Sequence, residues 1–253
     1  MIIGAQLYTL RDYCKTTEAF AQTLQRVADI GYTSVQVSGT CAYDAQWLAD
    51  ELKKNGLTCN LTHFSYDRIV GETEKVVAEH NTFGCKYIGV GSMPGWNADG
   101  AFEAFVERAS DAAKKIAQLG SYFMYHNHNF EYEKQIDDKK LMFALSDAFP
   151  PDVLGFTLDT YWVKAGGYDP VEELHRLAGR IPCIHFKDMT VLEDGTKHFA
   201  PIGSGILDFE KIAEAAQAGG TKYAFVEQDD CYGEDPFLCL KKSYDYLTSI
   251  GLK

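Results

Sequence analysis

The stretch that follows the first predicted strand reads QLYTLRDY, residues 6–13, and it contains no glycine. In a doubly wound open sheet, this position usually carries a glycine-rich loop that binds phosphate. The absence of such a loop favours a closed barrel over an open sheet. The choice between the two folds then depends on whether strands and helices alternate along the remaining chain.

Short apolar runs alternate with longer amphipathic segments throughout the sequence. The predicted strands are Ile2–Leu7, Thr33–Val37, Leu57–Thr62, Lys86–Val90, Ser121–His126, Val153–Leu158, Ile181–Phe186 and Lys222–Glu227. Helices are predicted between them, and glycine follows several of their ends. Strict alternation is typical of a parallel sheet, and eight such units in 253 residues match a (β/α)8 barrel. The sequence therefore predicts an α/β protein with a single TIM barrel domain over residues 1–253.

The composition argues against several classes of function. The formal net charge is −12, which disfavours binding to nucleic acid. No segment approaches the roughly 20 consecutive apolar residues of a membrane span, and the first residues do not resemble a signal peptide. The seven cysteines are scattered without a CxxC pair, which argues against disulfides and against a thiolate zinc site. We expect a cytoplasmic protein with a small-molecule substrate and with no nucleic-acid or membrane partner.

Polar side chains gather where the predicted strands end, which is where the active site of a TIM barrel lies. Residues at these ends are Gln6, Gln36, His63, His126, His128, Glu131, Asp159, Trp162, His185, Lys187 and Glu227. Four of the seven histidines belong to this set, and His198 lies in a rim loop. The other two, His80 and His175, fall in predicted helices, and we interpret them as surface residues.

Three carboxylates at one barrel mouth would repel one another and raise their own pKa values. A divalent cation removes that penalty, so Glu131, Asp159 and Glu227, together with His185, predict a metal site. One ion is expected, and Mn²⁺, Mg²⁺, Co²⁺ and Zn²⁺ all suit this donor set. The alternative is a network of ion pairs with Lys187 or Arg68.

Several motifs resemble those of the sugar phosphate isomerase/epimerase family in the xylose-isomerase-like TIM-barrel superfamily. The motifs are GAQLYTLRD, YHNHNFEY, LDTYWVKAGGYDP, IHFKD, PIGSGILDF and FVEQDD, and they cover essentially the whole chain in order. Members of this superfamily include ketose epimerases, inosose dehydratases and isomerases, and hydroxypyruvate isomerases. The resemblance implies one metal ligand from each of strands five to eight, and often pairing of two barrels into a homo-oligomer.

The fifth strand is where this chain departs from the family pattern. Asp159, His185 and Glu227 match the ligands of the later strands, but Tyr125 or His126 stands where relatives carry a glutamate. Either Glu131 reaches in from beyond the strand or His126 binds the metal directly. We prefer Glu131, because two histidines with two carboxylates would shift the site toward zinc.

The resemblance implies an isomerase or epimerase that abstracts a proton next to a metal-bound carbonyl of a keto-sugar or polyol. Glu227 is the expected base, and His126, His128 or Lys187 is the expected second acid/base. An acid/base pair of unlike type also suits a lyase or dehydratase that performs β-elimination on a 3-keto-sugar, 3-keto-glycoside or inosose.

The remaining rim residues are expected to contact the substrate. Gln6, Gln36, His63 and Trp162 would bind the sugar, and the Gly203-Ser204-Gly205 turn could offer backbone amides to a substrate oxygen. A non-catalytic sugar-binding barrel is a further alternative. A repair endonuclease of the same fold is disfavoured, because it needs more histidine ligands and a basic groove.

Overall fold

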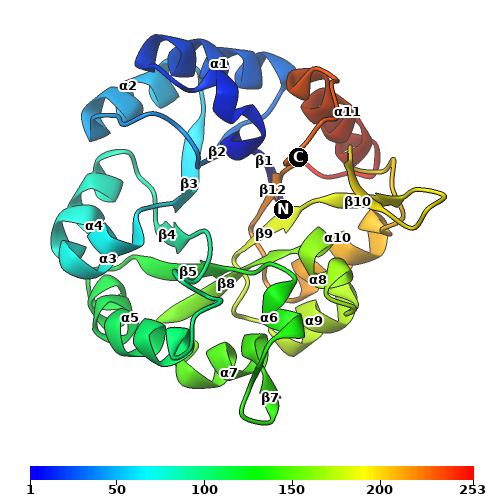
Figure 1. Cartoon of the computed structure of the whole chain (residues 1–253). Coiled ribbons are helices and arrows are strands. Elements are labelled where there is room, and N and C mark those ends of the chain that lie inside the picture. Colours follow the sequence, from blue (N-terminus) through cyan, green and yellow to red (C-terminus); the bar gives the residue numbers. More distant parts are fainter.

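The computed structural model describes residues 1–253 and shows a closed barrel of eight parallel strands surrounded by helices (Figure 1). The barrel strands are β1 (Ile2–Gln6), β2 (Ser34–Val37), β3 (Thr58–His63), β4 (Tyr87–Val90), β5 (Tyr122–His126), β8 (Leu154–Asp159), β9 (Cys183–Phe186) and β12 (Tyr223–Val226). They follow one another around the barrel in chain order, and β1 pairs with β12 to close it. The predicted TIM barrel is confirmed.

The helices pack outside the barrel. They are η1 (Leu7–Tyr13), α1 (Thr17–Ile30), α2 (Ala45–Lys54), α3 (Tyr66–Gly71), α4 (Thr73–Thr82), α5 (Ala101–Gln118), α6 (Phe130–Glu133), α7 (Leu141–Ala148), α8 (Thr160–Ala165), α9 (Pro170–Arg176), α10 (Phe209–Ala218) and α11 (Pro236–Ser249). Aspartates cap the N-termini of α2, α8, α9, α10 and α11 by accepting backbone N–H groups of the first turn. None of the helices combines the length and the apolar character needed to cross a membrane.

Two hairpins that were not expected from the sequence interrupt the alternation of strands and helices. The first joins β6 (Gln135–Ile136) to β7 (Lys139–Lys140), and the second joins β10 (Asp188–Val191) to β11 (Lys197–Ala200). The second hairpin follows β9 directly, at the end of the barrel where the polar residues gather. Phe199 of this hairpin packs against Tyr161 of α8, with ring centroids 4.4 Å apart. The hairpin thus forms part of the wall of the barrel mouth.

Side chains of each strand point alternately into the barrel and toward the helices, as the period of two requires. Leu61, Met124 and Phe225 belong to a small apolar cluster inside the barrel. Phe123 and Tyr125, the neighbours of Met124 in β5, belong instead to the larger core between strands and helices. The next residue in phase with Met124 is His126, so the alternation directs its imidazole into the barrel mouth.

The prediction that His80 is a surface residue is wrong. Its ring is fully buried, with Nδ1 2.7 Å from the carbonyl of Val76 and Nε2 2.9 Å from the hydroxyl of Thr62. Burial lowers the pKa of His80 to about 4, so the ring is neutral. Because both nitrogens have partners, the imidazole can pack on the inward face of α4 as an apolar residue would. His175 is exposed, as predicted.

Candidate metal centre

Four side chains meet at the C-terminal ends of neighbouring strands. They are His126 of β5, Asp159 of β8, His185 of β9 and Glu227, which directly follows β12. One ligand atom from each lies within 4.8 Å of the others, and all four residues are buried. Barrel closure brings these positions together, although they are spread over about a hundred residues of sequence.

Asp159 is held in place by its role as a helix cap. Its Oδ1 accepts the backbone N–H of Trp162 at 3.0 Å and so caps α8, while the side-chain oxygen of Asn127 accepts the N–H of Asp159 at 3.0 Å. The other oxygen, Oδ2, lies 3.2 Å from His126 Nε2 and 3.6 Å from His185 Nδ1. One oxygen of the carboxylate is therefore structural and the other faces the site.

The two imidazoles are oriented by partners outside the group. His126 donates its Nδ1 proton to the carbonyl of Gly91 at 2.9 Å, which leaves the lone pair of Nε2 directed toward Asp159. His185 donates from Nε2 to the side-chain oxygen of Gln36 at 2.6 Å, and its Nδ1 lies 2.9 Å from Glu227. An imidazole lone pair facing a carboxylate needs a cation between them, either a proton on the ring nitrogen or a metal ion. The four donors therefore fit a divalent ion, with the outer hydrogen bonds that metal-binding histidines usually make.

The centre is rich in negative charge, and this charge raises the pKa values of the cationic side chains within it. Burial alone would lower the pKa of His185, but the carboxylates of Glu227 and Asp159 raise it to about 9. Lys187 is buried beside them, with Nζ 3.2 Å from Glu227 and 3.4 Å from Asp159. Its closest partner, at 2.7 Å, is Asp229. The expected ion pairs with Lys187 thus exist alongside the donor group, whereas Arg68 pairs with Glu72 and Glu79 elsewhere.

Asp229 is a further, half-buried carboxylate of the centre that was not among the residues expected from the sequence. This residue lies two positions after Glu227 and shares its inward phase, so the period of the strand could have indicated it. Burial raises the pKa of Asp229 to about 6, and the nearby charge of Glu227 acts in the same direction. Lys187 opposes the shift through the ion pair between them.

Glu131 lies outside the four-residue group. Its carboxylate accepts the hydroxyl proton of Tyr125 at 2.7 Å and the backbone N–H of His128 at 2.7 Å. Because Tyr125 points away from the barrel interior, these bonds hold Glu131 on the outer side of β5. Of the two residues considered for the fifth strand, the structure brings His126 into the group and turns our preferred residue, Glu131, away from it.

The burial of Glu131 predicts a dependence of stability on pH. Burial raises the pKa of this carboxyl from 4.5 to about 8, against the opposing effect of its hydrogen bonds to Tyr125 and His128. Below pH 4.5 the group is protonated in folded and unfolded chains alike, and it then has no effect on stability. Above that pH the unfolded chain ionises first, so stability falls as the pH rises through 8.

We therefore expect the unfolding free energy of the natural chain to fall, relative to Glu131→Gln, by roughly 4 kcal/mol between about pH 5 and pH 8. Urea unfolding at a series of pH values measures this difference. Parallel pH profiles for the two chains would show that Glu131 is ionised in the folded protein.

The other predicted site residues also reach the barrel mouth. Buried polar atoms without a hydrogen-bond partner include Nε2 of Gln6, Gln36 and His63, Nδ1 of His128 and Nε1 of Trp162. The ring of His63 lies 5.0 Å from that of His126, and the ring of His128 lies 4.7 Å from it on another side. Burial lowers the pKa of His128 to about 3, so its ring is neutral. Unpaired buried polar atoms gathered at the strand ends indicate a ligand that pairs with them.

The Gly203-Ser204-Gly205 turn does not present its amides to the barrel mouth, contrary to our expectation. Instead, the buried carboxylate of Asp188 accepts the backbone N–H groups of Gly203 and Gly205, at 3.0 and 2.9 Å. It also accepts those of Met189 and Leu207. A side chain at Gly205 would collide with this carboxylate, which explains the glycine. The turn is a structural anchor for the β10–β11 hairpin.

Asp188→Ala is expected to lower the unfolding free energy by about 3 kcal/mol or more, because it leaves four backbone donors without their acceptor. Urea unfolding monitored by circular dichroism measures the loss. The matched control is Asp194→Ala in the turn of the same hairpin, where the exposed carboxylate accepts one N–H, from Thr196. Equal losses in the two variants would contradict the anchoring role.

Comparison with known proteins finds a family model and several relatives that resemble the chain. The family model described as Xylose isomerase-like TIM barrel matches residues 24–242. An inosose dehydratase of Geobacillus kaustophilus is 27% identical over an alignment of 194 positions, and the match covers 66% of this chain and 61% of that protein. An inosose dehydratase of Lacticaseibacillus casei is 27% identical over an alignment of 158 positions, and the match covers 56% of this chain and 51% of that protein. The chain thus spans only part of the length of these curated relatives.

The fold has close counterparts among solved structures. A sugar phosphate isomerase/epimerase from Parabacteroides distasonis superposes with a TM-score of 0.80 and 22% identity, covering 98% of this chain and 93% of that one. At this identity, the likeness supports the fold and carries no information on the substrate.

Proposed function

The chain belongs to the xylose isomerase-like TIM barrel family, and we propose that it is a metal-dependent lyase acting on a keto-sugar or keto-polyol. The reaction removes a proton from the carbon next to a carbonyl and expels the hydroxyl or alkoxy group on the following carbon. The observation that carries this proposal is the imidazole of His126 in the fifth-strand position, with Glu131 bonded to Tyr125 and turned away. A shuttle of two opposed glutamates would lack one member here.

His126, Asp159, His185 and Glu227 would hold the metal ion. A divalent ion bound there would polarise the substrate carbonyl and acidify the neighbouring C–H bond. Gln36 and Gly91 fix the orientation of the two imidazoles through their outer nitrogens. These outer contacts would keep the donor atoms in place as the substrate enters and leaves.

His128 is the proposed base. Its ring makes no hydrogen bond to the protein, its Nδ1 is buried without a partner, and it lies between His126 and Trp162 at the barrel mouth. Its pKa of about 3 keeps the ring unprotonated, and its free nitrogens can accept a proton from a substrate carbon that a bound metal ion would acidify. Trp162 would pack on the sugar, and the free amide nitrogens of Gln6 and Gln36 would bind its hydroxyl groups.

Lys187 is the proposed acid. Its ammonium group lies 2.7 Å from Asp229 and 3.2 Å from Glu227. Burial alone would lower its pKa, but the neighbouring carboxylates raise it, so the group is protonated. A divalent ion bound at the centre would offset the negative charge and ease release of the proton. In the elimination, His128 gains the proton from carbon while Lys187 protonates the departing oxygen, and a carbon–carbon double bond forms. Exchange with water then returns both groups to their starting states. The acid and the base are of different types, which suits an elimination.

Isomerisation or epimerisation is a second candidate, because two imidazoles, each with an unpaired ring nitrogen, flank the centre. His63 and His128 lie on different strand ends, with ring centroids 5.0 and 4.7 Å from that of His126. Two bases on different sides of a substrate could remove a proton from one face and return it to the other.

Proton NMR in D₂O distinguishes the two reactions. Chelator-treated protein is reloaded with Mn²⁺, Co²⁺ or Zn²⁺ and incubated with a keto-inositol or with a methyl 3-keto-glucoside. New vinylic signals would support elimination, whereas deuterium at carbon without vinylic signals would support isomerisation or epimerisation instead. Glu227→Gln and a protein-free sample are the controls. A chain that changes neither substrate but binds them would be a non-catalytic sugar-binding barrel.

A further inference from the structure

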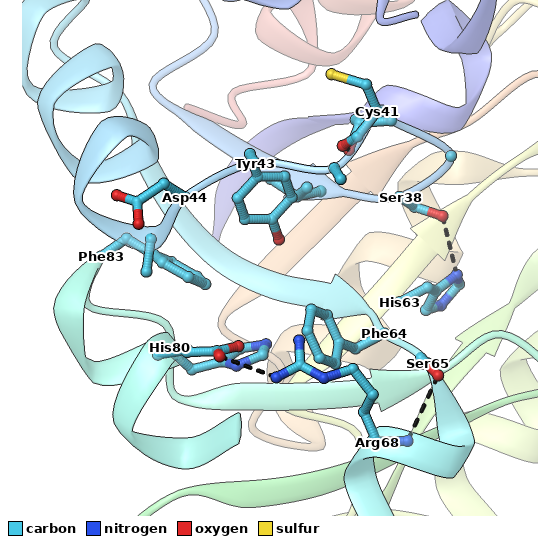
Figure 2. Close-up of a pocket in the computed structure, with 16 residues that line it drawn as sticks. Ser38, Cys41, Tyr43, Asp44, His63, Phe64, Ser65, Arg68, His80 and Phe83 are labelled. Carbon is cyan, nitrogen blue, oxygen red and sulfur yellow. Dashed lines mark hydrogen bonds and ion pairs between the residues drawn. The ribbon is translucent and has the colours of Figure 1, made fainter. Parts of the chain in front are cut away.

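A second cavity opens beside the metal centre, between the loop that follows β2 and the segment that follows β3 (Figure 2). We call it the side pocket. Its volume is about 370 Å³, which lies in the range of small-molecule sites. Its aromatic walls are formed by Tyr43, Phe64, His80 and Phe83.

His63 connects the side pocket to the centre. It lines the pocket, and its Nδ1 lies 3.4 Å from the hydroxyl of Ser38 (Figure 2). The other side of the same ring faces the centre, with centroids 5.0 Å from His126 and 5.4 Å from His185. A molecule whose sugar ring lies at the centre could therefore extend a substituent past His63 into the pocket.

The charged groups of the side pocket already have protein partners. Arg68 pairs with Glu79 at 2.9 Å and with Glu72 at 3.2 Å. Asp44 accepts two backbone N–H groups as the cap of α2, and both nitrogens of His80 are bonded within the protein. With no charge left unpaired, the pocket is unsuited to a phosphate or carboxylate group.

The polar groups also suit an aromatic ring better than a second sugar. Ser38 is engaged with His63, Thr40 donates to the carbonyl of Cys41, and Ser65 accepts the N–H of Arg68. Tyr43 lines the pocket, and its hydroxyl makes no hydrogen bond to the other lining residues (Figure 2). A second sugar would bring several hydroxyl groups that need partners, whereas an aromatic ring needs few.

We propose that the side pocket binds an uncharged aromatic group linked to the sugar, so that the substrate is an aryl keto-glycoside. The aromatic ring packs among Tyr43, Phe64 and Phe83, and a hydroxyl or ether oxygen on it accepts from Tyr43. This inference rests on the proposed function for the identity of the sugar part. The recognition of the aromatic part depends on the side pocket alone.

Binding of unoxidised probes tests the pocket without catalysis. Metal-free protein is titrated with 4-nitrophenyl β-D-glucoside and with methyl β-D-glucoside, and affinities are measured by NMR. We expect the aryl glucoside to bind at least tenfold more tightly, with intermolecular contacts between its ring protons and Tyr43. Equal affinities, or contacts elsewhere on the protein, would overturn the proposal.

A second experiment fills the side pocket with a larger side chain. Ala42 is exposed and lines the cavity, so Ala42→Phe should reduce aryl glucoside binding at least fivefold and leave methyl glucoside binding unchanged. The matched control is Ala98→Phe, an exposed position of the loop after β4 that does not line the cavity. If Ala42→Phe does not fold, Ser65→Trp is the replacement variant, because Ser65 lines the same cavity at the N-cap of α3. Unchanged aryl binding in a folded filling variant would contradict the proposal.

Turnover of the two 3-keto-glucosides separates this proposal from the proposed function. If the aryl probe binds in the pocket but neither keto-glucoside is eliminated, the function is wrong and the pocket assignment stands. If both are eliminated with equal kcat/KM and the probes bind equally, the function stands and the pocket assignment is wrong.

Discussion

Replacing Asp159 by asparagine is expected to lower divalent-metal affinity by about 100-fold or more and to abolish metal-dependent turnover. The change removes the charge of Oδ2, the oxygen that lies 3.2 Å from His126 and 3.6 Å from His185. It should preserve the cap of α8, because asparagine is as good a cap as aspartate. Calorimetric titration of chelator-treated protein measures the affinity, and an unchanged melting temperature would show that the fold is intact.

The same titration decides the ligand from the fifth strand. His126→Gln is expected to weaken metal binding, whereas Glu131→Gln is expected to leave it within about threefold of the natural chain. If Glu131→Gln weakened metal binding and His126→Gln did not, Glu131 would be the ligand instead. Because two of the four donors are imidazoles, we also expect Zn²⁺ and Co²⁺ to bind more tightly than Mg²⁺. Failure of every ion to bind would leave Lys187 and His185 as the only cations of the centre.

His128→Gln is expected to reduce kcat by about 10²- to 10⁴-fold, the range typical of a lost general base. Metal affinity should be unchanged, because His128 is not one of the four donors. KM should change little, since the amide can still form hydrogen bonds with the substrate. Steady-state kinetics on the substrate identified by NMR measures both constants.

His198→Gln is the matched control for this variant. His198 stacks on Tyr232 in the β10–β11 region, with ring centroids 4.0 Å apart, and it lies outside the centre. We expect its kcat to remain within about twofold of the natural value. Partial recovery of His128→Gln by added imidazole would support a role in proton transfer. If His128→Gln had the same kcat as the natural chain, the base would be Glu227 or His63 instead.

Local patterns in the sequence were enough to predict much of the fold and part of the candidate site. Alternating strand and helix signals predicted the barrel, because each unit must bury one apolar face against its neighbours. Asp159, His185 and Glu227 could be selected because each ends a predicted strand, and strand ends meet at one barrel mouth. The period of two could also have favoured His126 over Glu131, since His126 shares the phase of Met124, and it could have selected Asp229, which shares that of Glu227.

Other features depended on contacts between distant residues. His80 is buried because Thr62 of β3 and the carbonyl of Val76 satisfy both of its nitrogens, and only the packing of α4 against the barrel reveals this. The Gly203–Gly205 turn wraps Asp188, although its composition alone was equally consistent with a ligand-binding loop.

The sequence by itself determined an eight-stranded barrel with acidic and imidazole groups at its mouth, because apolar periodicity and strand-end position are local properties of the chain. The tertiary structure decided which of these groups face one another. Closure of the barrel set the phase of β5, so that His126 points inward while Tyr125 holds Glu131 outside. It also formed the side pocket, whose walls come from segments that only the folded barrel brings together.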